Sequence, residues 1–153
     1  MLLIKQWKLF VRNMHNVVFD TVIFVRSLIN PKSYWGRLVF DYFSNYRLFV
    51  SQQILIEILE VLKRPEITRK YRFIESLDIK SVLNILKNAE RVDLSEVPAV
   101  SRDIKDDKFL ATAKLANANY LISADRDLLD LKEYEGIKII DAQSFLKILE
   151  EEK

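Results

Sequence analysis

The chain has 153 residues, half of them hydrophobic, and a formal net charge of +2 at pH 7. A chain of this length forms one domain with a sizeable core, and a content of only two glycines and three prolines excludes a linker-like or disordered composition. It has no cysteine and one histidine, which excludes disulfides, thiolate metal sites and imidazole-based zinc, copper or haem centres. The balanced charge excludes a strongly basic domain that attracts nucleic acid through its overall field. Oxygen ligands are the metal-binding groups that the chain supplies in number.

The first 16 residues are interpreted as an N-terminal extension. Lys5, Lys8 and Arg12 interrupt their apolar pattern, and no small-residue cleavage site follows. We therefore expect neither a signal peptide nor a membrane span, and we expect the protein in the cytoplasm. A helix docked on the domain is one interpretation of this segment. The domain itself is predicted to span residues 17–150.

The domain begins with a strand at 17–20 and a helix that ends before Pro31, because proline disfavours the helical conformation of the residue before it. The next predicted elements are a helix at 33–43, a strand at 48–50, a helix after Ser51 that Pro65 ends or interrupts, two helices within 66–89, and a short strand at 91–93. The last are a helix at 104–117, a strand at 120–123, a short helix from 126, a strand at 137–140 and a helix at 142–150.

Strands that alternate with helices of this length pair in parallel through right-handed crossovers. We therefore predict an α/β fold. It is a three-layer α/β/α sandwich with a central parallel sheet and a helical insertion between the second and third strands.

Several acidic residues lie where a predicted strand ends. Asp20 follows the apolar run Val17-Val18-Phe19, and Asp125 and Asp127 follow a second apolar run. In open α/β sheets, ligand sites form at the carboxyl ends of the strands. A helix cap is the alternative for Asp20, whereas a cap explains one of the later two acids and not the second acid or Ser123 beside them. A functional role is therefore favoured at both strand ends.

Asp106 and Glu57 have equally ordinary interpretations. Asp106 lies with Asp103 and Asp107 at the start of a predicted helix, where acids cap the helix and complement its dipole by about 0.3–1 kcal/mol each. Glu57 is spaced for an exposed ion pair with Arg64, although its apolar neighbours permit a partly buried position. Spacing alone does not decide between a capping role and a functional role for Asp106, and it favours the ion pair for Glu57.

Four stretches, in the right order, resemble the PIN-domain family, a nuclease fold that includes the toxin component of many prokaryotic toxin–antitoxin pairs. They are Val-Val-Phe-Asp20-Thr-Val-Ile-Phe-Val, Val50-Ser-Gln-Gln-Ile-Leu-Ile-Glu57-Ile-Leu, Asp103-Ile-Lys-Asp106-Asp-Lys-Phe-Leu-Ala-Thr-Ala, and Ala118-Asn-Tyr-Leu-Ile-Ser-Ala-Asp125-Arg-Asp127-Leu-Leu. The resemblance runs from Val17 to Leu149. It implies a metal-dependent endoribonuclease, the toxin of a toxin–antitoxin pair.

The resemblance also implies the roles of the acids. The implied catalytic acids are Asp20, Glu57, Asp106 and Asp125, the metal ligands are Asp20, Asp106, Asp125 and Asp127, and Ser123 and Arg126 are the candidates for substrate contact. Asp103 then keeps its capping role. One position departs from the pattern: many members have asparagine two residues after the first aspartate, where this chain has Val22. The cofactor implied is Mg²⁺ or Mn²⁺, and the partners implied are single-stranded or structured RNA, an antitoxin protein and a second copy in a homodimer.

The chemistry of RNA hydrolysis suits such ligands. Mg²⁺ and Mn²⁺ prefer oxygen, neutralise charge on a phosphate and activate water. Two carboxylates ~4 Å apart repel by about 4 kcal/mol at an effective dielectric of 20, so a tight cluster needs protons or a bound cation. Four basic residues near the acids in sequence either contact phosphates or balance the acidic charge: Arg26, Lys105, Lys108 and Arg126.

Two other functions fit part of this pattern. A haloacid-dehalogenase-like phosphatase needs a second aspartate two positions after the first, and Val22 stands there. A catalytically inactive scaffold would use the acids only as helix caps and would bind protein or RNA. Stabilisation by Mn²⁺ distinguishes a true metal site from the scaffold, because a ligand that binds only the folded state stabilises it.

Overall fold

The computed structural model describes residues 3–6, 14–70, 76–95 and 104–152 of the chain. A six-stranded sheet with the order β3-β2-β1-β4-β6-β5 forms the centre of this described part. The strands are β1 (Asn16–Phe19), β2 (Arg47–Ser51), β3 (Glu90–Val92), β4 (Tyr120–Ile122), β5 (Glu133–Tyr134) and β6 (Ile137–Ile140). All neighbouring pairs are parallel except β5 with β6. The predicted α/β fold with a central parallel sheet is confirmed.

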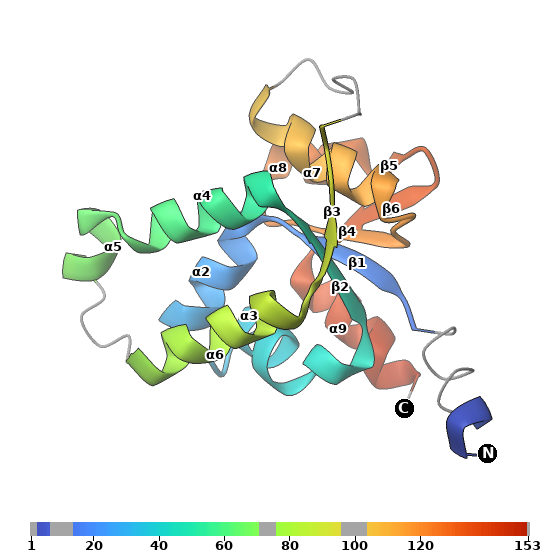
Figure 1. Ribbon diagram of the computed structural model, residues 1–153, viewed down its shortest axis with the longest axis horizontal. Helices are drawn as coiled ribbons and strands as arrows, with labels where there is room; N and C mark the ends of the chain where they lie inside the picture. The colour runs from blue at the N-terminus through green and yellow to red at the C-terminus, as the bar shows by residue number, and fades with distance from the viewer. Residues whose placement is uncertain (1–2, 7–13, 71–75, 96–103, 153) are drawn as a thin grey trace.

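Helices cover both faces of this sheet, which gives three layers (Figure 1). The α-helices described after β1 are α2 (Thr21–Ile29), α3 (Tyr34–Gly36), α4 (Gln52–Leu62), α5 (Pro65–Lys70), α6 (Ser76–Asn88), α7 (Ile104–Leu115), α8 (Arg126–Leu131) and α9 (Ala142–Glu151). Figure 1 shows α7 and α8 on one side of the sheet and α2, α3, α6 and α9 on the other. α4, α5 and α6 lie between β2 and β3 in sequence, and α5 and α6 are the two helices of the predicted helical insertion.

Short polar signals fix where strands end and helices begin. Asp20 and Asp141 each follow a parallel strand, Ser51 is the last residue of one, and the side chain of each accepts a hydrogen bond from the first turn of the next helix. α4 ends at Leu62, and Pro65 is the first residue of α5, a position where proline loses no helical hydrogen bond. The boundaries predicted at these points are confirmed.

The predicted helix at 33–43 is wrong in detail. The chain forms the single turn α3, then a π-helix at Arg37–Asp41 and a 3₁₀ turn at Phe43–Asn45. The Tyr46 hydroxyl donates to the Leu38 carbonyl at 2.9 Å, so that carbonyl is satisfied from outside the helix. A contact of this kind is tertiary, and hydrophobic periodicity does not encode it.

The sequence prediction also lacked β5, which has two residues and therefore no periodic pattern. It pairs antiparallel with β6 through a tight turn in which Glu135 and Gly136 have φ of 47° and 85°. Positive φ at both central residues is typical of the turn that joins such hairpins.

The order in which strands are added to the sheet reverses between the parallel neighbours β1 and β4. β2 follows β1 in sequence and lies on one side of it, whereas β5 and β6 follow β4 and both lie on the other side. The connections therefore diverge at the carboxyl ends of these two strands, which is the usual place for a ligand in such sheets. Asp20 follows β1 and Ser123 follows β4 at this point.

Only residues 3–6 and 14–16 of the N-terminal extension are described. Residues 3–6 form a helical turn, and its Leu3 and Ile4 are 80% and 60% exposed. These two side chains do not dock on the domain. No helix in the described ranges combines the length and the apolar character that crossing a membrane requires.

Candidate functional site

Asp20 lies at the centre of the carboxyl edge of the sheet. Its backbone N–H donates to the Ile122 carbonyl at 3.0 Å, and its side chain is buried. Carboxylate oxygen Oδ1 accepts the Ile23 N–H at 3.3 Å and so caps α2. Oxygen Oδ2 accepts the Ser123 hydroxyl at 2.5 Å and the Ala124 N–H at 3.0 Å. The side chain therefore caps a helix and also joins the ends of β1 and β4.

Burial raises the pKa of the Asp20 carboxyl above its ordinary value of 3.8. Hydrogen bonds from Ser123 and from the backbone N–H groups of Ala124, Ile23 and Val22 lower this pKa and offset part of the effect. Desolvation is the larger influence because it removes water from the charged form. A cation bound beside Asp20 would stabilise that charged form.

Ser123 connects Asp20 to the segment that carries the later acids. Its side chain is fully buried, and its Oγ accepts the Asp125 N–H at 2.9 Å. Asp125 Oδ1 in turn accepts the Asp127 N–H at 2.9 Å and caps α8. Asp125, Arg126 and Asp127 are all exposed at the start of that helix. The structure thus brings Asp20, Ser123 and Asp125 into one hydrogen-bonded segment, with Asp127 and Arg126 next to it.

Glu57 reaches the same edge from α4. Its Oε2 accepts a hydrogen bond from the Thr21 hydroxyl, and Thr21 directly follows Asp20. Its Oε1 lies 3.0 Å from Nζ of Lys108 on α7. The Glu57 side chain is 32% exposed, which agrees with the partly buried position that its apolar neighbours permit. Thr21 and Lys108, rather than a residue of its own helix, are the partners observed for this carboxylate.

Two hydroxyls hold α7 against the start of α4. The Thr112 hydroxyl is hydrogen-bonded to Ser51 Oγ at 2.9 Å and to the Lys108 carbonyl at 2.6 Å. Ser51 caps α4, and both hydroxyl side chains are fully buried. Sequence reasoning missed Thr21 and Thr112, because a threonine in an apolar run has the pattern of a core residue. The position of Thr21 immediately after the first aspartate was the signal that could have indicated its role.

The fourth predicted acid is described only in its backbone. α7 starts two residues before Asp106, so the Asp106 backbone lies in the first turn, two residues before Lys108. The side chains of Asp106, Asp107 and Lys105, and the whole of Asp103, lie outside the described residues. Because Lys108 contacts Glu57, the N-terminal half of α7 lies next to the acids.

The described side chains have the chemistry that a hard cation requires, but they do not form a complete coordination site. Among them, no three carboxylate or imidazole groups lie close enough together to hold one metal ion. The carboxylates and hydroxyls that gather at the edge offer oxygen, the ligand that Mg²⁺ and Mn²⁺ prefer. A cation would favour the charged form of Asp20, which burial disfavours.

Two further residues singled out in the sequence lie nearby on α2. The Arg26 guanidinium stacks over the Trp35 ring, 4.8 Å from its centroid. Val22, which stands in place of the asparagine common in the resembling family, is 39% exposed. It lies one residue after Thr21, in the first turn of α2.

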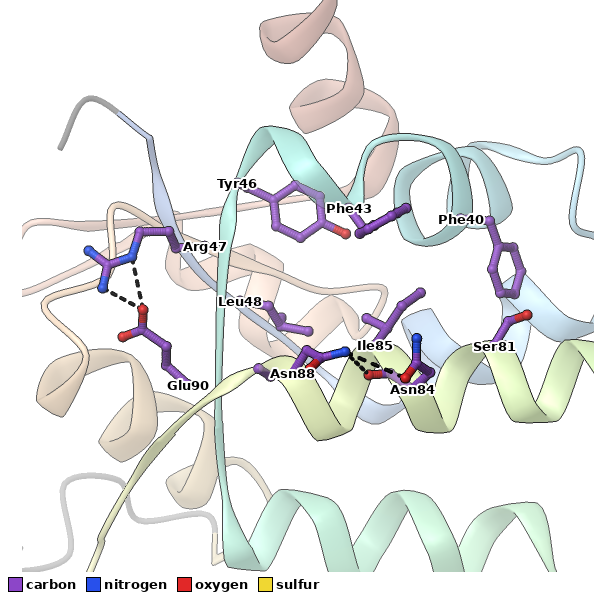
Figure 2. Close-up of a pocket in the computed structure, with 11 residues that line it drawn as sticks. Phe40, Phe43, Tyr46, Arg47, Leu48, Ser81, Asn84, Ile85, Asn88 and Glu90 are labelled. Atoms are coloured by element: carbon purple, nitrogen blue, oxygen red, sulfur yellow. Dashed lines mark hydrogen bonds and ion pairs between the residues drawn. The ribbon is translucent and has the colours of Figure 1, made fainter. Parts of the chain in front are cut away.

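A pocket of about 450 Å³ opens at the other end of β2. Figure 2 shows aromatic residues of the segment before β2, among them Phe40 and Phe43, facing Ile85 and Asn84 of α6. An ion pair between Arg47 and Glu90, the first residues of β2 and β3, closes one side. Because the pocket surrounds the amino end of β2, it is separate from the acids at the carboxyl edge.

Comparison with known proteins agrees with this arrangement. No curated protein matches the chain. The family model described as PIN domain matches residues 16–127, a span that contains the five predicted acids Asp20, Glu57, Asp106, Asp125 and Asp127. PIN domains are generally nucleases, and PIN-domain nucleases usually use divalent metal ions. With most of its length matched and the α/β fold in place, the chain belongs to the PIN domain family.

Proposed function

We propose that this protein is an Mg²⁺- or Mn²⁺-dependent endoribonuclease that hydrolyses RNA phosphodiester bonds. One observation supports this proposal above the others. Two sets of contacts meet along the carboxyl edge of the sheet: Glu57 binds Lys108 and the hydroxyl of Thr21, the residue after Asp20, and Ser123 binds the Asp20 carboxylate and the Asp125 N–H. Helix capping alone requires neither the contact between Thr21 and Glu57 nor the one between Ser123 and Asp20.

In this proposal, Asp20, Asp106 and Asp125 hold the principal cation directly or through water, with Asp127 beside them. The bound cation supplies charge neutralisation at the phosphate and a lowered pKa for water. Glu57 positions the attacking water or a second ion.

The neighbouring hydroxyls orient the acids. Thr21 fixes one oxygen of Glu57, and Ser123 fixes one oxygen of Asp20. Such supporting hydrogen bonds tune the affinity of a metal site, typically by 10–100-fold. Ser123 has its hydroxyl engaged by Asp20 and by the Asp125 N–H, so orientation is the role that its contacts support. Its contact with substrate, and that of Arg126, stay predictions.

A catalytically inactive scaffold is the second candidate, and a specific observation favours it. The Asp125 carboxylate caps its own helix, and no metal-binding trio is present among the described side chains. Under this alternative, Mn²⁺ leaves the thermal stability of the protein unchanged, whereas a true site raises it with the logarithm of the ligand concentration once that concentration exceeds Kd.

The biological role is proposed from the family resemblance. We propose that the protein acts in the cytoplasm as the toxin of a toxin–antitoxin pair, as a homodimer that an antitoxin protein binds. A small antitoxin-like reading frame beside the gene supports this role, and a genomic neighbourhood without one argues against it.

The test of the enzymatic proposal is cleavage of single-stranded RNA with Mg²⁺ or Mn²⁺ and with excess chelator. We expect cleavage with the metals, none with chelator, and none by Asp20→Asn or Asp125→Asn. Asp141→Asn is the matched control, because Asp141 also caps a helix after a parallel strand. Cleavage by both site variants at the rate of the control would refute the proposal.

A further inference from the structure

Lys108 lies at the acidic edge but belongs to neither the acids nor their hydroxyl supports. Its Nζ is 3.0 Å from Glu57 Oε1 and 5.3 Å from the centre of the Phe109 ring. The side chain is 22% exposed, so part of it faces the solvent from which a substrate would arrive. A lysine ammonium has three donors, and Glu57 is the carboxylate that it contacts in the described part of the chain.

The backbone of Lys108 is fixed while its side chain can move. The Lys108 carbonyl accepts the buried Thr112 hydroxyl, which is also hydrogen-bonded to the cap of α4. The base of the side chain is thereby held against the helix that carries Glu57. A flexible stem of four carbons separates the Lys108 backbone from the ammonium, so the ammonium can reach other anions without any movement of α7.

The pairing has a chemical consequence for Glu57. A carboxylate that binds an ammonium shares its charge with that cation, so a metal ion at the same edge meets competition and repulsion from Lys108. An arriving phosphodiester provides the ammonium with another anionic partner, and lysine is a suitable point charge for phosphate. Both effects favour movement of the ammonium from Glu57 to the substrate.

We propose that Lys108 is an exchangeable counter-ion of the site, paired with Glu57 in the free protein and with a backbone phosphate of RNA in the complex. This inference rests on the proposed function, since it assigns a substrate contact to the same site. It predicts that removal of the lysine charge has opposite effects on the two ligands: weaker binding of RNA and tighter binding of the metal ion.

The first measurement is RNA binding without metal. A fluorescently labelled single-stranded oligoribonucleotide is titrated with protein in excess chelator at several salt concentrations. Lys108→Gln should weaken binding and reduce the slope of log K against log salt by about 1, because one phosphate contact is lost. Lys108→Arg should retain the slope. Lys147→Gln, on an exposed position of α9, is the control and should match the wild type.

The second measurement is the Mn²⁺ concentration that half-saturates the rise in melting temperature, without RNA. Lys108→Gln should lower this concentration by roughly 2- to 5-fold, since a partly exposed competing charge is removed. A purely structural lysine would change neither the salt slope nor the Mn²⁺ midpoint in this direction.

The outcomes separate this inference from the proposed function. If the wild type binds and cleaves RNA with Mn²⁺ but Lys108→Gln matches Lys147→Gln in both measurements, the role of Lys108 is wrong and the nuclease proposal stands. If the wild type shows neither Mn²⁺ stabilisation nor cleavage, the nuclease proposal fails and the role of Lys108 fails with it.

Discussion

The Ser123 hydroxyl donates to Oδ2 of Asp20 at 2.5 Å, across the point where the strand order reverses. Burial raises the pKa of the Asp20 carboxyl, and this hydrogen bond lowers it again in part. Ser123→Ala should therefore make Asp20 harder to ionise and leave its carboxylate held by backbone N–H groups, among them those of Ile23 and Ala124. We expect metal-dependent cleavage and Mn²⁺ affinity to fall by about 10–100-fold, the usual effect of removing a residue that supports a ligand.

Activity assays and Mn²⁺ titrations of Ser123→Ala check this prediction, with Ser144→Ala on the exposed face of α9 as control. Equal Mn²⁺ affinities for the two variants would show that Ser123 does not orient the site.

Asp20 should make the metal-free protein less stable as the pH rises. Its pKa is higher in the folded state than the ordinary value of 3.8, so the folded state holds this proton more tightly than the unfolded chain. The stability that this tighter proton binding gives to the folded state is present in full below pH 3.8, and it is lost as the pH rises through the pKa that Asp20 has in the folded state. Asp20→Asn removes this loss.

The measurement for Asp20 is urea unfolding in excess chelator over a pH series. The variant should gain stability relative to the wild type as the pH increases towards neutrality. Added Mn²⁺ should reverse the order, because only the wild type binds it well. A difference between the two proteins that stays constant with pH would contradict the burial of this carboxyl.

Thr21 should matter for activity more than for stability. Thr21→Val keeps the shape and removes the hydroxyl that Glu57 accepts, which lowers the free energy of unfolding by about 0.5–1.5 kcal/mol. Cleavage should fall by about tenfold or more, as for other supporting residues. Thr21→Ser keeps the donor and should keep most of the activity. Kinetics and chemical unfolding of both variants check this, and full activity of the valine variant would exclude the positioning role.

Gly36 is required by packing rather than by function. A Cβ at this position would lie 2.1 Å from the Pro31 carbonyl oxygen, a backbone atom that cannot turn aside. Gly36→Ala should therefore destabilise the fold by about 3 kcal/mol or more. Gly136→Ala is the comparison, since its Cβ would meet nothing within 4 Å and only its positive φ is unfavourable, at about 1–2 kcal/mol. Equal losses in chemical unfolding would show that the Pro31 contact relaxes freely.

Much of the fold could be predicted from local signals. The runs that became β1 and β4 are continuous and apolar because parallel strands are buried on both faces, and Asp20 and Ser51 mark the helix starts. The π-helix at Arg37–Asp41 could not be predicted, because it depends on tertiary contacts such as the one from Tyr46 to Leu38.

The site was predictable in the same uneven way. Asp20 and Asp125 follow strands, so topology alone brings them to one edge. The contact of Glu57 with Lys108 depends on how α4 and α7 lie against each other, and the spacing along α4 pointed instead to Arg64. Thr21 and Glu57 are 36 positions apart in sequence and belong to different helices, so no local pattern predicts their contact.

The most direct test of the account is to locate the metal. Crystals of the protein grown with Mn²⁺ should give an anomalous peak at the carboxyl ends of β1 and β4, in contact with the carboxylates of Asp20, Asp106 and Asp125 directly or through water. No peak at that edge with Mn²⁺ well above the concentration needed for cleavage, or carboxylates of Asp20 and Asp125 bound to helix N–H groups alone, would contradict it.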